Sequence, residues 1–369
     1  WKPTKFTDGG SPLLDEETIE GAVARYPELA GVGEYLMLDK RLSQLMGSKQ
    51  SLMAAAGDDG RIHGSINPMG TITGRASHFS PNLAQVPSAK KPYGQEFRSL
   101  FRAPNGWRLV GADMQGLELR GLAHYLSFFD GGAYGRQLLE GDPHWATVIS
   151  LGLLPPGTAR DKHNQLHGLL RDHAKTFTYG VCYGAGAKKA GSIIHETVLA
   201  ARAVGPEGVN VYRKFFGDDM APDDERLTRV GSKARKMFAE GIEGFGVLQD
   251  QVTKRATERG YIKGLDGRLI PLRKGHAALN TLIQSWGAIC CKRWVADAFD
   301  ELSARYAPGR DFYFCGWIHD EIQTAVRDGL EKEVGDIIVK CAQEAGKPYG
   351  VRIRLDSEAI IGTDWGATH

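Results

Sequence analysis

Hydrophobic positions along the chain follow two kinds of pattern, one helical and one extended. Apolar residues recur at helical spacing in 28–56, 116–129, 277–305 and 330–346. Dense apolar runs that are typical of buried strands occupy 107–113, 311–318, 321–326 and 352–361. Turn residues crowd 60–106, whereas mostly helical patterns fill 144–200 and 208–262. This order predicts an α+β fold in which a sheet of sequence-distant strands is interrupted by a large helical insertion.

The composition is that of a folded protein and excludes several classes. Of the 369 residues, 42% are hydrophobic and 24% are charged, which excludes general disorder and suggests two or three structural units. The 47 glycines have no three-residue period, so collagen is excluded. A net charge of +2 argues against binding nucleic acid by charge alone. Residues 254–274 nevertheless hold seven Lys or Arg and two acidic residues, a basic stretch that can follow phosphates.

Cysteine usage and hydropathy bear on the compartment. Five cysteines without a CxxC pair give no zinc signal and favour a reducing environment. The sequence shows neither a signal-peptide pattern nor a run of about 18 apolar residues, so we expect neither secretion nor a membrane partner. We therefore expect a cytoplasmic protein.

Acidic residues follow two of the predicted strands. Asp113 ends the strand that begins at Trp107, and Asp320 with Glu321 separates two further strands. If these strands are neighbours in one sheet, Asp113 and Asp320 lie close together, and their like charges repel unless a cation neutralises them. Oxygen ligands of this kind suit Mg²⁺ and phosphate chemistry. The alternative is that each aspartate is only a turn residue or a helix cap.

One predicted helix carries cations and an aromatic ring on a single face. At 100° per residue, one side of 171–186 presents Arg171, Lys175, Thr178, Tyr179 and Cys182. Two cations and a ring at successive turns suit a triphosphate followed by a sugar and a base. The alternative is a solvated basic face with a half-buried tyrosine, which is the commoner situation for an arbitrary helix.

Four segments in order resemble the sequence motifs of family A DNA polymerases. VGADMQGLELRGLAHYL (110–126) is similar to motif A, RDHAKTFTYGVCYG (171–184) to motif B and WIHDEIQ (317–323) to motif C. TGRASHFSPNLAQVPS (73–88) resembles the element that precedes motif A. Details such as GLELR, YGAG, GLDGR and HAALNTLIQS look most like the replicative polymerases of T-odd bacteriophages. The resemblance implies a phage or phage-like DNA polymerase, acting in the host cytoplasm if viral.

The resemblance also implies a role for each motif residue. Two Mg²⁺ ions would be bound by Asp113, Asp320 and the backbone carbonyl of Met114. The incoming dNTP would be contacted by Arg171, Lys175, Tyr179, His144, Glu118 and Tyr183, with Tyr183 beside the templating base. The primer–template would be contacted by Arg75, Asn280, Gln284 and His319, and Glu321 would act beside the primer 3′ end. The catalytic set would be Asp113, Asp320, Lys175 and Glu321.

Sugar selection follows from two of these residues. Glu118 lies five residues after Asp113, and Tyr179 lies one turn beyond Lys175. We expect the Tyr179 hydroxyl to hydrogen-bond Glu118 and to close the space beneath C2′ of the sugar. A ribose 2′-OH would then clash with, or desolvate, Glu118.

The resemblance further implies a right-hand arrangement of domains. Residues 1–64 would be a thumb remnant and palm entry, 65–125 the first part of the palm, 126–279 the fingers and 280–369 the second part of the palm. Neither a 3′–5′ exonuclease nor a complete thumb is expected in the chain, so a separate chain or a processivity factor is a candidate partner beside primer–template DNA and dNTPs. The stretch between His144 and Arg171 looks longer than in the phage enzymes, and its role is open.

Two other functions fit part of the pattern. A single-subunit RNA polymerase shares the two aspartates and the Lys175–Tyr179 helix, but Glu118 and Glu321 favour DNA synthesis. A non-catalytic DNA-binding or assembly subunit is the second alternative, which the intact motif residues disfavour. Primer extension with dNTPs and then rNTPs separates the three.

Overall fold

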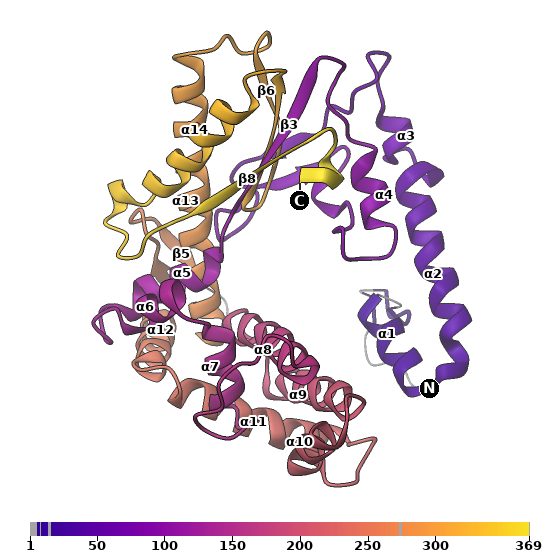
Figure 1. Cartoon of the computed structure of the whole chain (residues 1–369), viewed down its shortest axis with the longest axis vertical. Coiled ribbons are helices and arrows are strands. Elements are labelled where there is room, and N and C mark those ends of the chain that lie inside the picture. Colours follow the sequence, from indigo (N-terminus) through magenta and orange to yellow (C-terminus); the bar gives the residue numbers. More distant parts are fainter. Residues whose placement is uncertain (1–5, 8, 14–15, 273–274, 369) are drawn as a thin grey trace. The chain divides into compact units, whose positions relative to one another are not determined.

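The computed structural model describes residues 6–7, 9–13, 16–272 and 275–368 (Figure 1). Contacts divide the chain into two compact units, 1–67 with 77–101 and 68–76 with 102–369. Parts of the predicted thumb remnant, the basic residues Arg273 and Lys274, and the final His369 lie outside the described residues. Within the described part of the chain, no helix is both long and apolar enough to span a bilayer.

The smaller unit is built mainly from short helices. It contains α1 (Glu16–Arg25), α2 (Ala30–Leu42), α3 (Leu52–Ala55), α4 (Gly94–Ser99) and an antiparallel pair, β1 (Ser65–Asn67) with β2 (Ser77–Phe79). The prediction of one helix over 28–56 was wrong. A π-helical turn, Ser43–Gly47, follows α2, Ser48 is extended at φ −143°, and the Ser51 side chain caps the separate helix α3.

The larger unit contains the predicted sheet. Its four strands are β3 (Trp107–Met114), β6 (Phe312–Ile318), β7 (Glu321–Arg327) and β8 (Ser357–Gly362), in the order β6-β7-β3-β8 with antiparallel pairing throughout. Two helices, α13 (Ala278–Ser303) and α14 (Glu331–Glu344), pack together and bury a core that includes Val110, Trp286 and Trp294. The α+β prediction is confirmed.

The final strand is shorter than its sequence suggested. We predicted a strand over 352–361, but β8 begins only at Ser357. The Arg352 N–H donates to Nδ1 of His124, and the Asp356 carbonyl accepts the Gln115 N–H at 3.0 Å. These contacts satisfy backbone groups of 352–356 without strand pairing, so this segment precedes the strand and is not part of it.

The long insertion between β3 and β6 is mainly helical. It contains α5 (Leu117–Leu126), α6 (Ala133–Glu140), α7 (Pro143–Ser150), α8 (Gln165–Cys182), α9 (Ala187–Arg202), α10 (Pro206–Phe216), α11 (Asp224–Glu240) and α12 (Phe245–Arg259), then the hairpin β4 (Tyr261–Lys263) with β5 (Leu269–Pro271). A second hydrophobic core lies among these helices, with Phe177, Tyr212 and Phe238 almost fully buried.

Helices α9 and α11 approach unusually closely. A Cβ built on Gly191 would lie 1.9 Å from the Leu227 carbonyl oxygen, and one on Gly231 would lie 1.9 Å from the Ala187 carbonyl oxygen. No side chain fits at either position, so the two helices meet through their backbones.

Candidate active site

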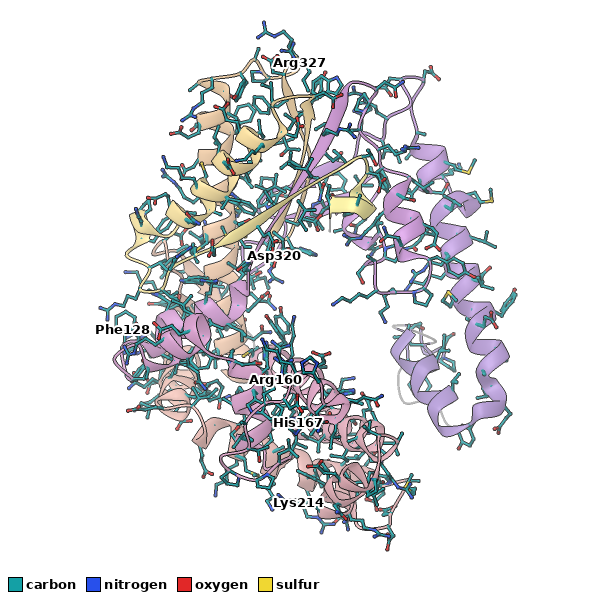
Figure 2. The ribbon with its side chains drawn as sticks, in the orientation of Figure 1. Phe128, Arg160, His167, Lys214, Asp320 and Arg327 are labelled. Carbon is teal, nitrogen blue, oxygen red and sulfur yellow. The ribbon has the colours of Figure 1, made fainter. Side chains whose placement is uncertain are left out.

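Strand pairing brings the two predicted metal-binding aspartates to one end of the sheet. Asp113 lies near the end of β3 and opposite Glu321, the first residue of β7, while Asp320 occupies the turn between β6 and β7. The Met114 N–H donates to the Asp320 carbonyl at 2.9 Å, which fixes the turn against β3. Figure 2 shows Asp320 at this end of the sheet. The expectation that the two carboxylate-bearing strand ends are neighbours is therefore confirmed.

The environment of Asp320 opposes its negative charge. Burial, followed by the nearby Glu118 carboxylate, raises the pKa of Asp320 to about 6 although its own turn and Arg75 act in the other direction. A carboxylate destabilised in this way gains from a bound cation. Within the described residues there is no group of three or more His, Cys, Asp or Glu side chains arranged for a metal. A cation at Asp113 and Asp320 would thus complete its shell with carbonyls, water or phosphate oxygens, as Mg²⁺ commonly does.

The turn that carries Asp320 has an unusual backbone. His319 adopts a φ of 59°, a left-handed conformation that few non-glycine residues adopt. The Trp317 indole N–H donates to the His319 carbonyl at 3.1 Å and supports this conformation. His319 is exposed beside Asp320. Its contact with the primer stays a prediction.

The buried Glu118 carboxylate is the centre of a partly buried hydrogen-bond cluster. Its Oε1 accepts from Nη2 of Arg75 at 2.7 Å and from the hydroxyl of Tyr183 at 2.7 Å. We predicted that the tyrosine bonded to Glu118 would be Tyr179, and this was wrong for the structure described. Tyr183 follows Tyr179 by one helical turn and is the first residue after the end of α8. From this position its hydroxyl reaches the Glu118 carboxylate. Burial and Glu118 raise the pKa of Tyr183.

Tyr179 nevertheless lies among the acidic groups of the site. Its ring is half-buried, 6.3 Å from the Tyr183 ring and 6.2 Å from the His144 ring between centroids. Burial raises its pKa to about 12, with further contributions from Glu118, Asp320 and Asp113. The helical insertion therefore presents Tyr179 to the same carboxylates that the sheet positions.

Helix α8 presents the predicted cations, although only part of the predicted face is open. The Asn164 side chain caps its start by accepting from the backbone N–H groups of Leu166 and His167. Lys175 is exposed, and its Nζ lies 5.9 Å from the centroid of the Tyr179 ring. Thr178 and Cys182, which we placed on the same face, are buried in the helical core. The usable face is therefore narrower than the periodicity indicated.

The two other predicted phosphate contacts, Arg171 and His144, differ in their hydrogen bonding. Nε of Arg171 donates to Oδ2 of Asp142 at 2.9 Å, a partner that we did not predict. His144 is buried, and burial with the nearby Arg171 lowers its pKa to about 4. Its Nδ1 has no hydrogen-bond partner within the described residues. A neutral imidazole with an unused nitrogen keeps the capacity for a further hydrogen bond.

Glu321 has a structural role that the sequence did not reveal. The carboxylate is buried and its Oε1 accepts from the Gln323 amide at 2.7 Å and from the Trp365 indole at 2.5 Å. Thr368 donates to Oε1 of Gln323 at 2.9 Å, so a 3₁₀ helix, η6 (Trp365–Thr368), is bonded to β7. The catalytic role predicted for Glu321 stays a prediction. The one feature of the sequence that relates to this contact is the tryptophan at position 365, which the structure shows to be buried.

The remaining predicted DNA contacts lie on α13. Asn280 and Gln284 are one turn apart and half-buried, and the Gln284 amide donates to Oδ1 of Asn280 at 2.9 Å. Trp286, two residues after Gln284, packs into the core beside the sheet and holds the helix there. The two amides thus share one face of a rigid helix, but nothing in the structure tests their contact with DNA.

Comparisons with known proteins agree with this architecture. A family model described as DNA polymerase family A matches residues 1–367. The chain is 37% identical to a DNA-directed DNA polymerase of Enterobacteria phage T3 and 36% identical to that of Escherichia phage T7. Each alignment covers 100% of this chain and 50% of the relative, so the chain spans about half the length of these phage proteins.

A solved structure shows the same fold. It is the POL domain of Pol1 from M. smegmatis in complex with DNA primer–template and dNTP, matched with a TM-score of 0.74 at 20% sequence identity. The match covers 100% of this chain and 58% of that chain. At this identity the likeness bears on the fold alone, whereas the family model and the phage relatives bear on descent. The chain belongs to DNA polymerase family A.

Proposed function

We propose that this chain catalyses template-directed attack of a primer 3′-OH on the α-phosphate of a dNTP, with release of pyrophosphate. The observation that carries the proposal is the pairing of β3 with β7, which sets Asp113 beside the turn that bears Asp320. The name of the phage relatives, DNA-directed DNA polymerase, supports it. Because the chain spans only half of those proteins, their activity is a proposal here.

The proposed cofactor is Mg²⁺, as two ions. Asp113, Asp320 and the backbone carbonyl of Met114 would hold them at the end of the sheet. When bound, the ions supply charge neutralisation and activation of oxygen nucleophiles. Asp113 and Asp320 stand on backbone that ladder and turn hydrogen bonds fix, so binding of the ions would need little rearrangement of the chain.

The proposed nucleotide site combines α8 with the start of α5. Lys175, Arg171 and His144 would bind the triphosphate, since phosphoryl transfer depends on positioning and charge neutralisation. Tyr179 would lie against the sugar, and Glu118 would exclude a ribose 2′-OH. Tyr183 would release Glu118 to lie beside the templating base. In that position the Tyr183 hydroxyl would no longer make its 2.7 Å hydrogen bond to Glu118.

The proposed partners are primer–template DNA and dNTPs. Arg75, Asn280, Gln284 and His319 would contact the primer–template, and Glu321 would act near the primer end. Minor-groove acceptors are similar in all correct base pairs, so these side chains can test pair shape without reading sequence. The division into thumb remnant, palm and fingers, a second chain with thumb and exonuclease, a processivity factor and a cytoplasmic site of action are further predictions of the same proposal.

Primer extension tests the proposal directly. The purified chain, a labelled primer–template and Mg²⁺ should give products with dNTPs and far less with rNTPs. Preference for rNTPs would favour an RNA polymerase. DNA binding without extension, unchanged by Asp113→Ala, would favour a non-catalytic subunit.

A further inference from the structure

Two arginines, Arg160 and Arg171, share the carboxylate of Asp142, the residue that caps the start of α7. Asp142 Oδ2 accepts two hydrogen bonds of 2.9 Å, one from Nη1 of Arg160 and one from Nε of Arg171. Its other oxygen accepts the Trp145 N–H at 3.1 Å and so caps α7. One partner of Asp142 is a proposed triphosphate contact, and the other comes from the stretch whose role the sequence left open.

The segment that carries Arg160 is built into the helical layer. Leu151, Leu153 and Leu154 are buried. The Trp145 indole donates to the Thr158 carbonyl at 2.9 Å, and Nδ1 of His167 accepts the Asp161 N–H at 3.0 Å. These contacts lie on both sides of Arg160 in the sequence and fix the position of its backbone. In the view of Figure 2, Arg160 lies on the side of the helical layer nearer Asp320, whereas Lys214 marks the far side.

Positive charge exceeds negative charge around Asp142. Arg160 and Arg171 both contact the Asp142 carboxylate, and Lys175 follows Arg171 by one turn on α8. Asp172 also contacts Arg171, but at 3.4 Å and with a side chain that is 76% exposed, so solvent screens it. A triphosphate needs such a surplus. Without Arg160, the charge of Asp142 would fall on Arg171 alone.

We propose that Arg160 is a positioning residue for nucleotide binding, which neutralises Asp142 so that Asp142 orients Arg171 without cancelling its charge. The inference rests on the proposed function, because it takes Arg171 to be a triphosphate contact. It adds a residue from the segment between α7 and α8 to the nucleotide site, and it gives Asp142 the role of a shared anchor.

The first test measures steady-state primer extension. Arg160→Ala should raise the KM for dNTP by about fivefold to tenfold while kcat stays within about twofold, because a screened charge near the phosphates is unbalanced and the reacting atoms are untouched. Arg160→Lys should restore part of the affinity. Arg213→Ala is the matched control, since Arg213 forms an exposed ion pair with Asp218 elsewhere in the same layer. An unchanged KM in Arg160→Ala overturns the inference.

The second test separates positioning from direct contact. Asp142→Asn keeps the cap of α7, because asparagine caps as well as aspartate, but removes the charge. In the Asp142→Asn and Arg171→Ala backgrounds, adding Arg160→Ala should no longer raise the KM. An equal rise in all backgrounds would mean that Arg160 acts independently and would overturn the proposed role.

The third test measures dNTP binding without the chemical step. Affinity of the next dNTP for a complex with a dideoxy-terminated primer should weaken in Arg160→Ala by the same factor as the KM rises. A wild-type chain that extends no primer overturns the proposed function and this inference with it. A wild-type chain that extends primers, with Arg160→Ala identical to it in both assays, overturns the inference alone.

Discussion

The sheet and the helical insertion hold their functional side chains by different means. Asp113 and Asp320 are short side chains on backbone that strand pairing and the Met114–Asp320 hydrogen bond fix. Arg171 and Lys175 are long side chains on a helix. Arg171 is held by the Asp142 carboxylate, and Lys175 lies near the Tyr179 ring. Backbone pairing therefore determines the geometry of the anionic side of the site, whereas exchangeable ion pairs determine that of the cationic side. Substitutions on the two sides should differ in size and in the kinetic parameter that they change.

The largest effect should come from the sheet. Asp113→Ala or Asp320→Ala should slow primer extension by about a thousandfold or more, because the metal clamp supplies most of the catalysis. Gel-shift affinity for primer–template should survive, since many dispersed phosphate contacts supply it. Asp336→Ala is the control, an exposed carboxylate paired with Lys332 on α14. A mutant that keeps a tenth of the wild-type rate would show that the site is misassigned.

The next effect concerns sugar selection. Glu118→Ala should raise rNTP use relative to dNTP use by about tenfold to a hundredfold, because the space beneath C2′ opens and no buried carboxylate is desolvated. Competition between rNTP and dNTP in single-nucleotide extension measures it. Glu140→Ala, an exposed position on α6, should leave the ratio unchanged. An unchanged ratio in Glu118→Ala would remove Glu118 from the sugar pocket.

A smaller change should separate the two tyrosines. Tyr179→Phe should increase discrimination against ddNTPs by about tenfold, because the hydroxyl that replaces the missing 3′-OH is lost and an unpaired polar group costs about 1–3 kcal/mol. Tyr183→Phe should leave the ddNTP to dNTP ratio near that of wild type, since Tyr183 would lie beside the templating base and away from the sugar. Equal ratios in wild type and Tyr179→Phe would show that Tyr179 does not face the sugar.

The smallest effects should be on stability, and two adjacent carboxylates should respond in opposite directions. The folded pKa of Asp320, about 6, lies above its unfolded value of 3.8, so its ionised form costs stability above pH 6 and nothing below pH 4. In EDTA at pH 8, Asp320→Asn should stabilise the protein by about 1–2 kcal/mol, and the gain should vanish as the pH falls to 4. Glu321→Gln should destabilise it by about 1–2 kcal/mol, because two hydrogen bonds lose their charged acceptor. Thermal melts at the two pH values measure both changes, and shifts of the same sign would contradict the comparison.

The sequence predicted the sheet side of the site better than the helical side. Strands that end on Asp113 and Asp320 followed from apolar runs, because a buried strand leaves a short-range signal and pairing then sets its ends side by side. The partners of Glu118 and Arg171 did not follow. Tyr183 and Asp142 are 65 and 29 residues away from them, and a long side chain can reach several acceptors at similar cost. The bond between Glu321 and Trp365 was also hidden, because it needs tertiary contact between β7 and the last turn of the chain.

The backbone contact between α9 and α11 has a mechanical consequence. Packed helices usually slide on the side chains between them, through small rotamer changes, and so permit shear. At Gly191 and Gly231 no side chain separates the two helices, and a carbonyl oxygen of the other helix lies 1.9 Å from the position that a Cβ would take. We therefore expect α9 and α11 to move together as one rigid body. We expect the two helices to move by hinge rotation at their ends and not by sliding past each other. A larger residue at Gly191 or Gly231 would force α9 and α11 apart.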